Sequence, residues 1–402
     1  MPISREKHKL VSTSTDCITD FAVVWIVMSS TTVVFALKNM SATMMVLLGF
    51  AVFIGFRNGT ITLKNLRITG IIFLIGMVNF AANYRFYEAG ADIIILLIRL
   101  VSCTVIASAI ERDRFIKIYV LVMKWMAIVS VICFAAVFAG ATLPLQVAEQ
   151  INGITYFYTP YYVLGFGGIQ YRNCGMFWEP GGYQIYLNLA LLFVICRPEL
   201  FCKQKKELIK YIILFSVTIL TTLSTTGFLC FAVVLAIGVL NSNHDRKLKR
   251  NLMFIIVLAA IGLALVESNL GIIENKLING EGSFSTRSND TQVTFELALT
   301  RPVFGYGFTN GYMPRYFAAK GVEGNSNGIG AFMCAMGIPT TILYLGQMLK
   351  QLRALLKTNT VSTCLILGLL LLFFMSESVM IVTIFVFLLY APVERNSNIC
   401  EE

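Results

Sequence analysis

The feature that most constrains this chain is a series of long apolar segments separated by short polar ones. About 20 consecutive apolar residues, within a range of roughly 17–25, cross the hydrocarbon core of a bilayer. Such segments recur between Phe21 and Ala391, and only 13% of the 402 residues are charged. A soluble domain carries about 25% charged residues, so the composition excludes a water-facing fold. The pattern predicts an all-α, polytopic integral membrane protein in a lipid bilayer.

We expect about twelve transmembrane helices, which form a single domain over residues 1–402. Their apolar centres are Phe21–Leu37, Ser41–Phe56, Ile68–Ala82, Ile93–Ile110, Ile118–Ala141, Tyr183–Cys196, Tyr211–Leu223, Phe228–Leu240, Leu252–Val266, Ile329–Leu349, Val361–Phe374 and Val379–Ala391.

Two apolar stretches are interrupted near their middle. Ser224–Gly227 divide Tyr211–Leu240, and Ser376–Ser378 divide Val361–Ala391, so each stretch is either one helix or a hairpin. A single helix over Tyr211–Leu240 would be about 45 Å long, well beyond a hydrocarbon core of about 30 Å. A turn is therefore favoured in the first stretch. The second is also interpreted as a hairpin, although one helix remains the alternative there.

Lysine and arginine are distributed unevenly between the two sides of the predicted bundle. With twelve helices, inside loops and tails carry 22 of the 32 basic residues and outside loops carry eight, while Arg99 and Lys124 lie within helices. Cytoplasmic loops are enriched in Lys and Arg, so both termini are expected in the cytoplasm. This bias accounts for the net charge of +10. Without a basic face outside the membrane segments, nucleic acid is not expected as a partner.

Two outside loops are long, and the others are short. The first runs over residues 142–182 and the second over residues 269–328. Basic residues of the second loop oppose the positive-inside bias, and Arg is the preferred partner of phosphate oxygens. The sequence therefore predicts an acidic ligand at the outer face.

The second loop contains a candidate phosphate site. Thr291–Thr300 is interpreted as a short helix with Asn289 as its N-cap, ended by Arg301-Pro302. Arg287 then lies just ahead of a helix N-terminus, where free N–H groups, the helix dipole and a guanidinium together suit a phosphate. The alternative is a solvated loop arginine.

The first long loop ends in a polar and aromatic motif just before a helix. Arg172 and Glu179 flank the aromatic pair Phe177-Trp178, and Pro180 marks the helix start. The alternative is an interfacial aromatic belt with a snorkelling Arg and an incidental Glu.

The sequence lacks the residues that several kinds of metal and cofactor chemistry require. The only histidines are His8 and His244, both predicted inside, and no Cys/His zinc spacing or phosphate-binding glycine loop is found. We predict no metal and no cofactor. Cys174 alone lies clearly in an outside loop, so we predict no disulfide. Arg99 lies deep in a helix, where it either approaches a lipid phosphate or pairs within the bundle.

Four motifs, in this order, resemble the O-antigen polymerase and O-antigen ligase superfamily of bacterial envelopes. They are Arg172-x-x-Gly175-x-Phe177-x-Glu179-Pro180-Gly181; the turn Ser224–Gly227; Arg287 followed by a helix and Pro302-x-x-Gly305-x-Gly307; and Asn325 to Asn327, which open an apolar helix with Gly337. The resemblance covers residues 165–345, and the first five helices resemble the family only in hydropathy.

The resemblance implies a GT-C-like helical bundle with two long periplasmic loops in the bacterial inner membrane. It implies a metal-independent glycosyltransferase that uses undecaprenyl-pyrophosphate-linked glycans, with a flippase and a chain-length regulator as partners. Ligases of the family usually carry a His near residues 324–327, and this chain has none there. We therefore expect a polymerase of repeat units for O-antigen, capsule or exopolysaccharide. An O-antigen ligase and a flippase or transporter are the alternatives.

The same resemblance suggests roles for individual residues. Arg172 and Arg287 are expected to stabilise the departing pyrophosphate, and Glu179 is the candidate base or acceptor-orienting group, unless it only pairs with Arg172. The candidate substrate-binding residues are Arg301, Arg315, Asn325, Asn327 and Arg99.

Overall fold

The computed structural model describes most of the chain, in several ranges. These are residues 3–59, 61–84, 91–167, 169–201, 205–241, 247–252, 262, 283–308, 311–322 and 327–394. Within them, side chains are described except at residues 3–16, 91–93, 169–170, 205 and 283–288.

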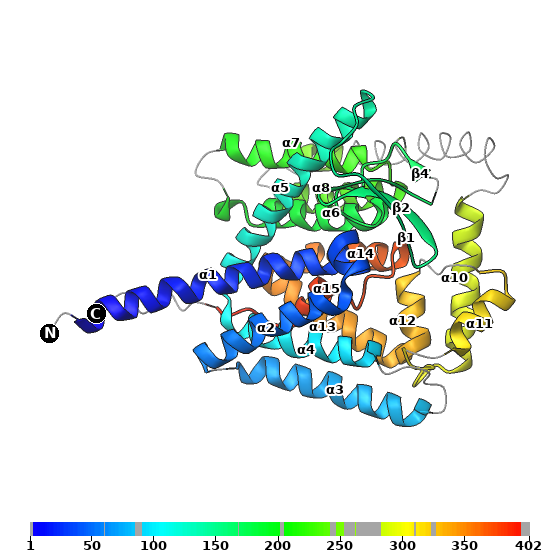
Figure 1. The fold of residues 1–402 in the computed structure, drawn as a ribbon, viewed down its shortest axis with the longest axis horizontal. Coiled ribbons are helices and arrows are strands. Elements are labelled where there is room, and N and C mark those ends of the chain that lie inside the picture. Colours follow the sequence, from blue (N-terminus) through cyan, green and yellow to red (C-terminus); the bar gives the residue numbers. More distant parts are fainter. Residues whose placement is uncertain are drawn as a thin grey trace.

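Helices make up most of the described chain, as the apolar pattern predicts (Figure 1). In hydrocarbon a helix satisfies every backbone N–H and C=O within one segment, which is why apolar stretches adopt it. In chain order the helices are α1 (Ile3–Thr31), the π-helix η1 (Val33–Lys38), α2 (Met40–Asn58), α3 (Leu63–Asn83), α4 (Ala91–Ala109), α5 (Arg112–Phe138), α6 (Pro180–Cys196), the 3-10 helix η3 (Pro198–Leu200), α7 (Lys205–Thr221), α8 (Thr225–Asn241), α10 (Ser283–Thr300), α11 (Tyr312–Ala319), α12 (Gly328–Met336), α13 (Ile338–Leu356), α14 (Thr360–Ser376) and α15 (Thr383–Phe387).

Three helices of the described part, α2, α3 and α5, are long and apolar enough to cross a membrane. Other apolar helices, such as α6, α8 and α14, have 17 residues each. A helix of that length spans about 25 Å, slightly less than a hydrocarbon core of about 30 Å. The chain is therefore a helical membrane protein, while the number of twelve crossings stays a prediction. The expected span Leu252–Val266 lies almost wholly outside the described residues.

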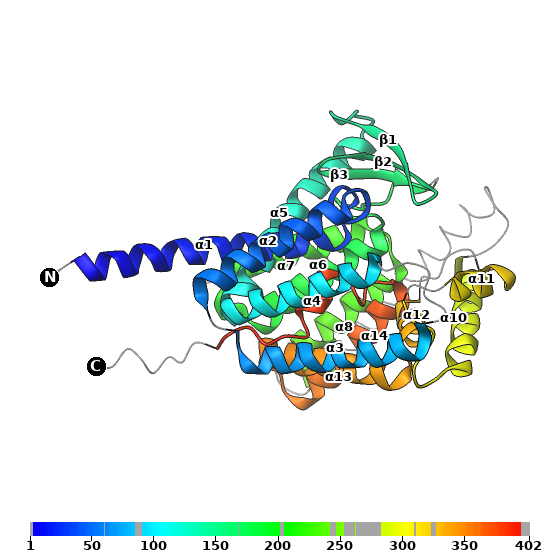
Figure 2. The ribbon, with the colours of Figure 1, turned by 60° about the horizontal axis from the view of Figure 1, so that its bottom comes forward.

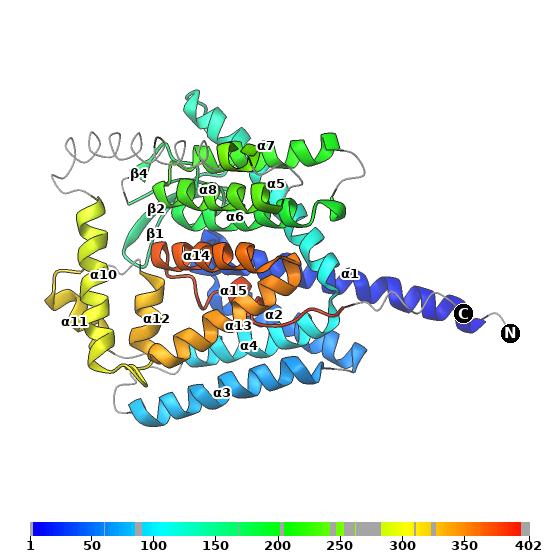
Figure 3. The same cartoon turned by 180° about the vertical axis from the view of Figure 1, so that it is seen from behind.

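The helices run side by side, and their connecting elements gather at one end. In Figures 1 and 2 a small sheet, α10 and α11 lie at the same end of the bundle, which we call the loop end. The start of α1 lies at the opposite end. Seen from behind, α13 and α14 lie between α3 and the layer of α6, α7 and α8 (Figure 3).

The first long loop folds into a sheet, which the sequence analysis did not predict. Strands β1 (Val147–Ile151), β2 (Ile154–Thr159), β3 (Tyr162–Phe166) and β4 (Ile169–Gln170) form an antiparallel sheet in sequence order. At the β1–β2 turn, Asn152 and Gly153 both have positive φ, at 51° and 83°. This is the turn chemistry of a tight hairpin. One face packs on η1 through Tyr156, Tyr158 and Val33.

Two expected helices prove to be broken. The stretch Phe21–Leu37 divides into α1 and η1, and Ile329–Leu349 divides into α12 and α13 at Gly337. Gly337 has φ of 81°, and a side chain there would collide with the backbone carbonyl of Val303. A residue other than glycine is unfavourable at such a position, so the backbone turns between the two helices. In Figures 1 and 3, α12 runs across the bundle rather than along it.

The last expected span is not a transmembrane helix. The turn expected at Ser376–Ser378 is confirmed, but beyond it the chain forms only the five-residue α15 within Val379–Ala391. We call Val379–Ala391 the crossing segment; it is buried except at Ile381, which is partly buried. Irregular backbone is tolerated at membrane depth where protein covers it and satisfies its polar groups.

Polar side chains of neighbouring helices satisfy that irregular backbone. Tyr344 of α13 donates to the carbonyl of Met380 at 2.6 Å, and Gln347 Nε2 donates to that of Leu389 at 2.7 Å. Asn65 of α3 both accepts from the N–H of Ala391 and donates to its carbonyl. These side chains replace the hydrogen bonds that a helix would have supplied.

Candidate functional site

The motif of the first loop is held against the break between α1 and η1. The N–H of Trp178 donates to the carbonyl of Thr31, and the N–H of Val33 donates to that of Met176, both at 3.1 Å. These bonds form because Thr32 lies in an extended conformation between the two helices. The motif is thereby fixed at the loop end, just ahead of α6.

Arg172 contacts the turn between α7 and α8. Its Nε donates to the carbonyl of Thr222 at 3.1 Å, and its Nη2 donates to that of Leu223 at 2.7 Å. These carbonyls follow the C-terminus of α7, where the helix dipole favours a cation. The turn expected at Ser224–Gly227 is confirmed, although it lies earlier, at Thr222–Ser224. Arg172 thus connects the first loop to this turn.

Glu179 occupies the N-cap position of α6, directly before Pro180. Its Oε1 accepts from Nε1 of Trp178 at 2.9 Å, and the side chain is half-buried. Burial, with a smaller contribution from the negative charge of Glu179, raises the pKa of Tyr156 to about 12. The carboxylate therefore lies near the tyrosine hydroxyl of β2, between the sheet and the start of α6.

The phosphate site expected at Arg287 is not built as predicted. Helix α10 begins at Ser283 rather than near Thr291, so Asn289 is inside the helix and is not its N-cap. Arg287 belongs to the first turns of α10, and its side chain lies outside the described residues. The predicted end of the helix at Arg301-Pro302 is confirmed.

A hydrogen bond from Arg301 connects the segment after α10 to the loop end of α3. Its Nη1 donates to Oδ1 of Asn83 at 2.7 Å, and its guanidinium carbon lies 5.1 Å from the ring centre of Tyr306. Asn79, one turn before Asn83, donates to the carbonyls of Phe304 and Ala335. The ring of Tyr306 in turn stacks on that of an exposed tyrosine at the start of α11.

Asn327 is a buried helix cap. Its Oδ1 accepts from the N–H of Gly330 at 2.9 Å, and its Nδ2 donates to Thr291 of α10 at 3.3 Å. It therefore fixes the N-terminus of α12 against α10. Arg315 is exposed on α11. Asn325 lies outside the described residues.

The side chain of Arg99 forms hydrogen bonds within the helical bundle. It is 7% exposed, and its Nη1 donates to the carbonyl of Ile381 in the crossing segment at 3.0 Å. Of the two expectations for Arg99, these contacts favour a partner within the bundle. The residue lies among helices rather than with the loop motifs.

Glu377 is a buried acid at the loop end that the sequence analysis used only as a helix break. It is 4% exposed and follows the last residue of α14. A side chain at Gly181 of α6 would collide with its carboxylate, and one at Gly328 of α12 would collide with its backbone. Glu377 is therefore closely packed between the N-termini of α6 and α12. A single acid in an otherwise apolar stretch is the sequence signal that could have identified it.

The structure thus brings the first-loop motif and the second-loop motif to one end of the bundle. Glu179 and Asn327 are the N-caps of the two helices that meet at Glu377. Arg172 and Arg301 lie in the same end region but contact different helices, α7 and α3. Glu179 and Asn327 therefore lie at helix N-termini, whereas the two guanidinium groups lie at the C-terminal ends of α7 and α3. Guanidinium groups suit an anionic ligand such as a phosphate.

Comparison with known proteins assigns a family to part of this chain. Residues 211–345 match the family model described as O-antigen ligase. No curated protein and no solved structure gives a match. The matched range runs from within α7 to within α13, so it includes α10, α11 and α12 but not the first-loop motif or Glu377. Members of this family transfer glycosyl groups. Residues 211–345 are thus similar to the O-antigen polymerase and ligase superfamily, and the apolar helices indicate a membrane protein.

Proposed function

We propose that the chain polymerises undecaprenyl-pyrophosphate-linked oligosaccharide repeat units into a surface polysaccharide. The loop end would face the periplasm, and both termini would lie on the cytoplasmic side of the bacterial inner membrane. The observation that carries the proposal is the meeting of α6 and α12 at Glu377. This contact joins the motif around Glu179 to the part of the O-antigen ligase domain around Asn327.

The reaction is a glycosyl transfer between two lipid-linked glycans. A hydroxyl oxygen of one repeat unit attacks the anomeric carbon of the other, forming the new glycosidic bond. The bond from that carbon to pyrophosphate breaks, and lipid pyrophosphate leaves with the electron pair. The hydroxyl proton passes to a carboxylate. Guanidinium groups stabilise the charge that develops on the leaving oxygen.

The contacts at the loop end support different roles for the candidate residues. Glu179 accepts the proton, because its carboxylate lies at the loop end and is partly exposed, whereas that of Glu377 is buried. Arg287, Arg301 and Arg315 bind the pyrophosphate. Arg172 acts as a positioning residue, since its hydrogen bonds hold the turn after α7.

The remaining roles belong to the two asparagines at the start of α12 and to Glu377. Asn325 orients the sugar or phosphate groups at the start of α12. Asn327, which is 1% exposed, caps α12 and holds it against α10. Glu377 positions the two helix N-termini and does not itself contact substrate, because it is 4% exposed. Transfer needs no metal in this scheme.

Polymerase is favoured over ligase because no His lies near residues 324–327, where family ligases usually carry one. A ligase would move finished glycan to a separate acceptor such as lipid A core. A flippase would move repeat units between leaflets and transfer nothing. A flippase and a chain-length regulator are expected as partners of the polymerase.

Deletion of the gene separates these functions by the product that accumulates. Loss of a polymerase leaves single repeat units on their anchor, which a gel of surface polysaccharide shows as one short band. Accumulation of long chains on the lipid carrier would instead indicate a ligase. Repeat units trapped on the cytoplasmic leaflet would indicate a flippase.

A further inference from the structure

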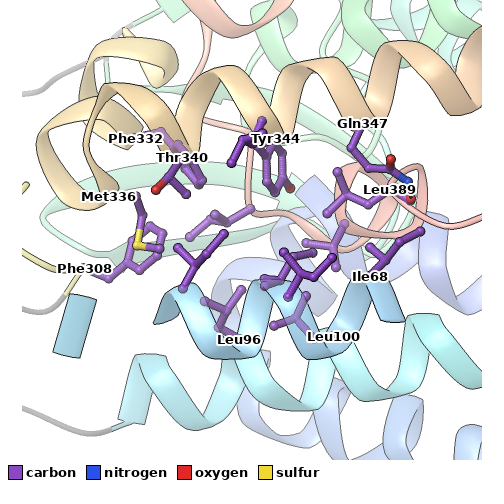
Figure 4. A pocket seen from close by; sticks show the side chains of 16 residues that line it. Ile68, Leu96, Leu100, Phe308, Phe332, Met336, Thr340, Tyr344, Gln347 and Leu389 are labelled. Carbon is purple, nitrogen blue, oxygen red and sulfur yellow. Dashed lines mark hydrogen bonds between the residues drawn. The ribbon is translucent and has the colours of Figure 1, made fainter. Parts of the chain in front are cut away.

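An apolar cavity of about 210 Å³ lies between α3 and α13 (Figure 4). Its walls come from α3, α4, α12, α13 and the crossing segment. In Figure 4, Phe332, Met336 and Tyr344 line one side, and Leu96 and Leu100 line the other. The cavity extends along α3 from Ile68 to Ile75, which is about 10 Å at 1.5 Å per residue.

Three polar side chains line the cavity, those of Thr340, Tyr344 and Gln347, and two of them direct hydrogen bonds away from it. The hydroxyl of Tyr344 donates to Met380, and the amide of Gln347 donates to Leu389, both in the crossing segment. What remains facing the space is almost wholly hydrocarbon. An apolar cavity of about 150 Å³ stays dry and binds a small hydrocarbon, so this larger one suits part of a hydrocarbon chain.

The cavity opens toward the surface that the membrane covers. Ile71 of α3 and Leu343 of α13 both line it, yet they are 57% and 61% exposed. The neighbouring apolar residues Leu74 and Ile342, which do not line the cavity, are exposed as well. A chain inside the cavity can therefore continue into the bilayer between α3 and α13.

The other end of the cavity approaches the candidate pyrophosphate-binding residues. Ile75 lines the cavity, and Asn83, two helical turns further along α3, accepts from Arg301. The eight residues between them correspond to about 12 Å. A phosphate beside Arg301 and a hydrocarbon in the cavity can thus belong to one molecule.

We propose that this cavity binds the head-proximal isoprenoid chain of the lipid pyrophosphate carrier. This inference rests on the proposed function, because it assigns the chain of that same donor. The guanidinium of Arg301, whose partner Asn83 lies about 12 Å along α3 from the cavity, favours a lipid with a strongly anionic head. The remainder of the chain lies in the bilayer outside α3 and α13.

Photo-crosslinking tests the site in the full-length protein without requiring turnover. The probe is undecaprenyl pyrophosphate with a diazirine on an isoprene unit near the head, added to protein in phosphatidylethanolamine and phosphatidylglycerol vesicles. Adducts are mapped by mass spectrometry. We expect them on cavity residues of α3, α13 and the crossing segment, with competition by unlabelled undecaprenyl pyrophosphate but not by added phosphatidylglycerol.

Matched tryptophan variants make the test specific. Leu343→Trp fills the cavity mouth and should lower the cavity adducts about tenfold, the effect of losing roughly 1.4 kcal/mol of binding. Ile342→Trp lies on the same helix outside the cavity and should leave them unchanged. The thermal unfolding temperature of both variants shows that each remains folded.

Three results would overturn the inference: adducts spread evenly over lipid-facing residues, equal competition by phosphatidylglycerol, or an unchanged adduct pattern in Leu343→Trp. The assay reads binding alone, so the polymerase assignment is judged separately. If specific adducts form while the protein makes no polymer, the proposed function fails and the lipid site stands. If polymer forms while the adducts are unspecific, the lipid site fails and the proposed function stands.

Discussion

The carboxylate of Glu377 lies directly against the backbone of Gly181, although the two residues are far apart in the sequence. Gly181 belongs to the first turn of α6, so the negative charge lies beside the positive end of that helix dipole. The backbone of Glu377 meets Gly328 at the first turn of α12. One residue after α14 therefore sets the spacing between the two helices that carry Glu179 and Asn327.

Replacing Gly181 by alanine should destabilise the protein. The added methyl group would overlap the Glu377 carboxylate, and overpacking of this kind costs about 1–3 kcal/mol. Thermal unfolding in detergent measures the loss. The matched control is Gly182→Ala, where the nearest atom to the new carbon is 3.5 Å away and no collision occurs. Equal stability of the two variants would contradict the contact.

The variant Glu377→Gln keeps the shape of the side chain and removes its charge. The loss of a carboxylate at a helix N-terminus should cost about 0.3–2 kcal/mol. Glu377→Ala removes the group that Gly181→Ala would overlap, so the effects of these two substitutions should not add, and a double-mutant cycle should give an interaction energy of about 0.5–3 kcal/mol. Strict additivity would show that Glu377 does not act through Gly181.

Substitutions of Arg172 distinguish a positioning role from direct catalysis. Its two hydrogen bonds hold carbonyls after α7, and a hydrogen bond to a charged group contributes about 1.5–3 kcal/mol. Arg172→Ala should therefore lower stability and activity together, with partial rescue by Arg172→Lys. A large fall in kcat at unchanged stability, without rescue by lysine, would instead place Arg172 in contact with the reacting groups.

The contact between the sheet and η1 should weaken slightly at low pH, because one of its links is an exposed ion pair. Glu149 of β1 accepts from Lys38 at 2.6 Å and from Tyr158, and these bonds hold the pKa of its carboxyl below the ordinary 4.5. A lowered pKa means that the stabilisation is present above 4.5 and is lost as the pH falls through the folded-state value. The pKa of Lys38 is raised, first by its hydrogen bond to Glu149, so Lys38 stays charged through neutral pH and loses its proton only in strong alkali.

Fluorescence of Trp178, beside the sheet, reports this change. In a variant that retains this tryptophan alone, acid should shift the emission below the ordinary pKa of glutamate. In Glu149→Gln the shift should disappear. If both proteins respond alike, some other acid controls the transition.

Some breaks in the fold were predicted from polar residues or proline that interrupt an apolar stretch, but those at Thr32 and Gly337 were missed, although Ser29–Thr32 and Pro339 mark them in the same way. The turns near Ser224 and Ser376 and the end of α10 before Pro302 all follow that rule. The sheet was missed although Asn152-Gly153 between β-branched and aromatic residues is a strong hairpin signal. Hydropathy hides such a hairpin, because its strands are nearly as apolar as a helix.

The irregular crossing segment could not be predicted from its own residues. Val379–Ala391 has the composition of a helix. Most of its backbone can remain non-helical because Tyr344, Gln347 and Asn65 of other helices form hydrogen bonds with its backbone groups. The same applies to Glu377, whose neighbours come from α6 and α12. Such long-range partners leave no local pattern, so the sequence indicated candidate residues in both loops but not the contact that joins them.

Reconstituted transfer tests the central claim most directly. Purified protein in vesicles receives a synthetic undecaprenyl-pyrophosphate-linked repeat unit as the only glycan, and products are separated by length. We predict a ladder of lipid-linked chains that grow by whole repeat units, with release of undecaprenyl pyrophosphate. Arg301→Ala should slow it by about 10²–10³, as for loss of one donor that stabilises a transition-state charge. Failure to lengthen the glycan, with transfer appearing only when a separate lipid A core acceptor is supplied, would contradict the polymerase assignment.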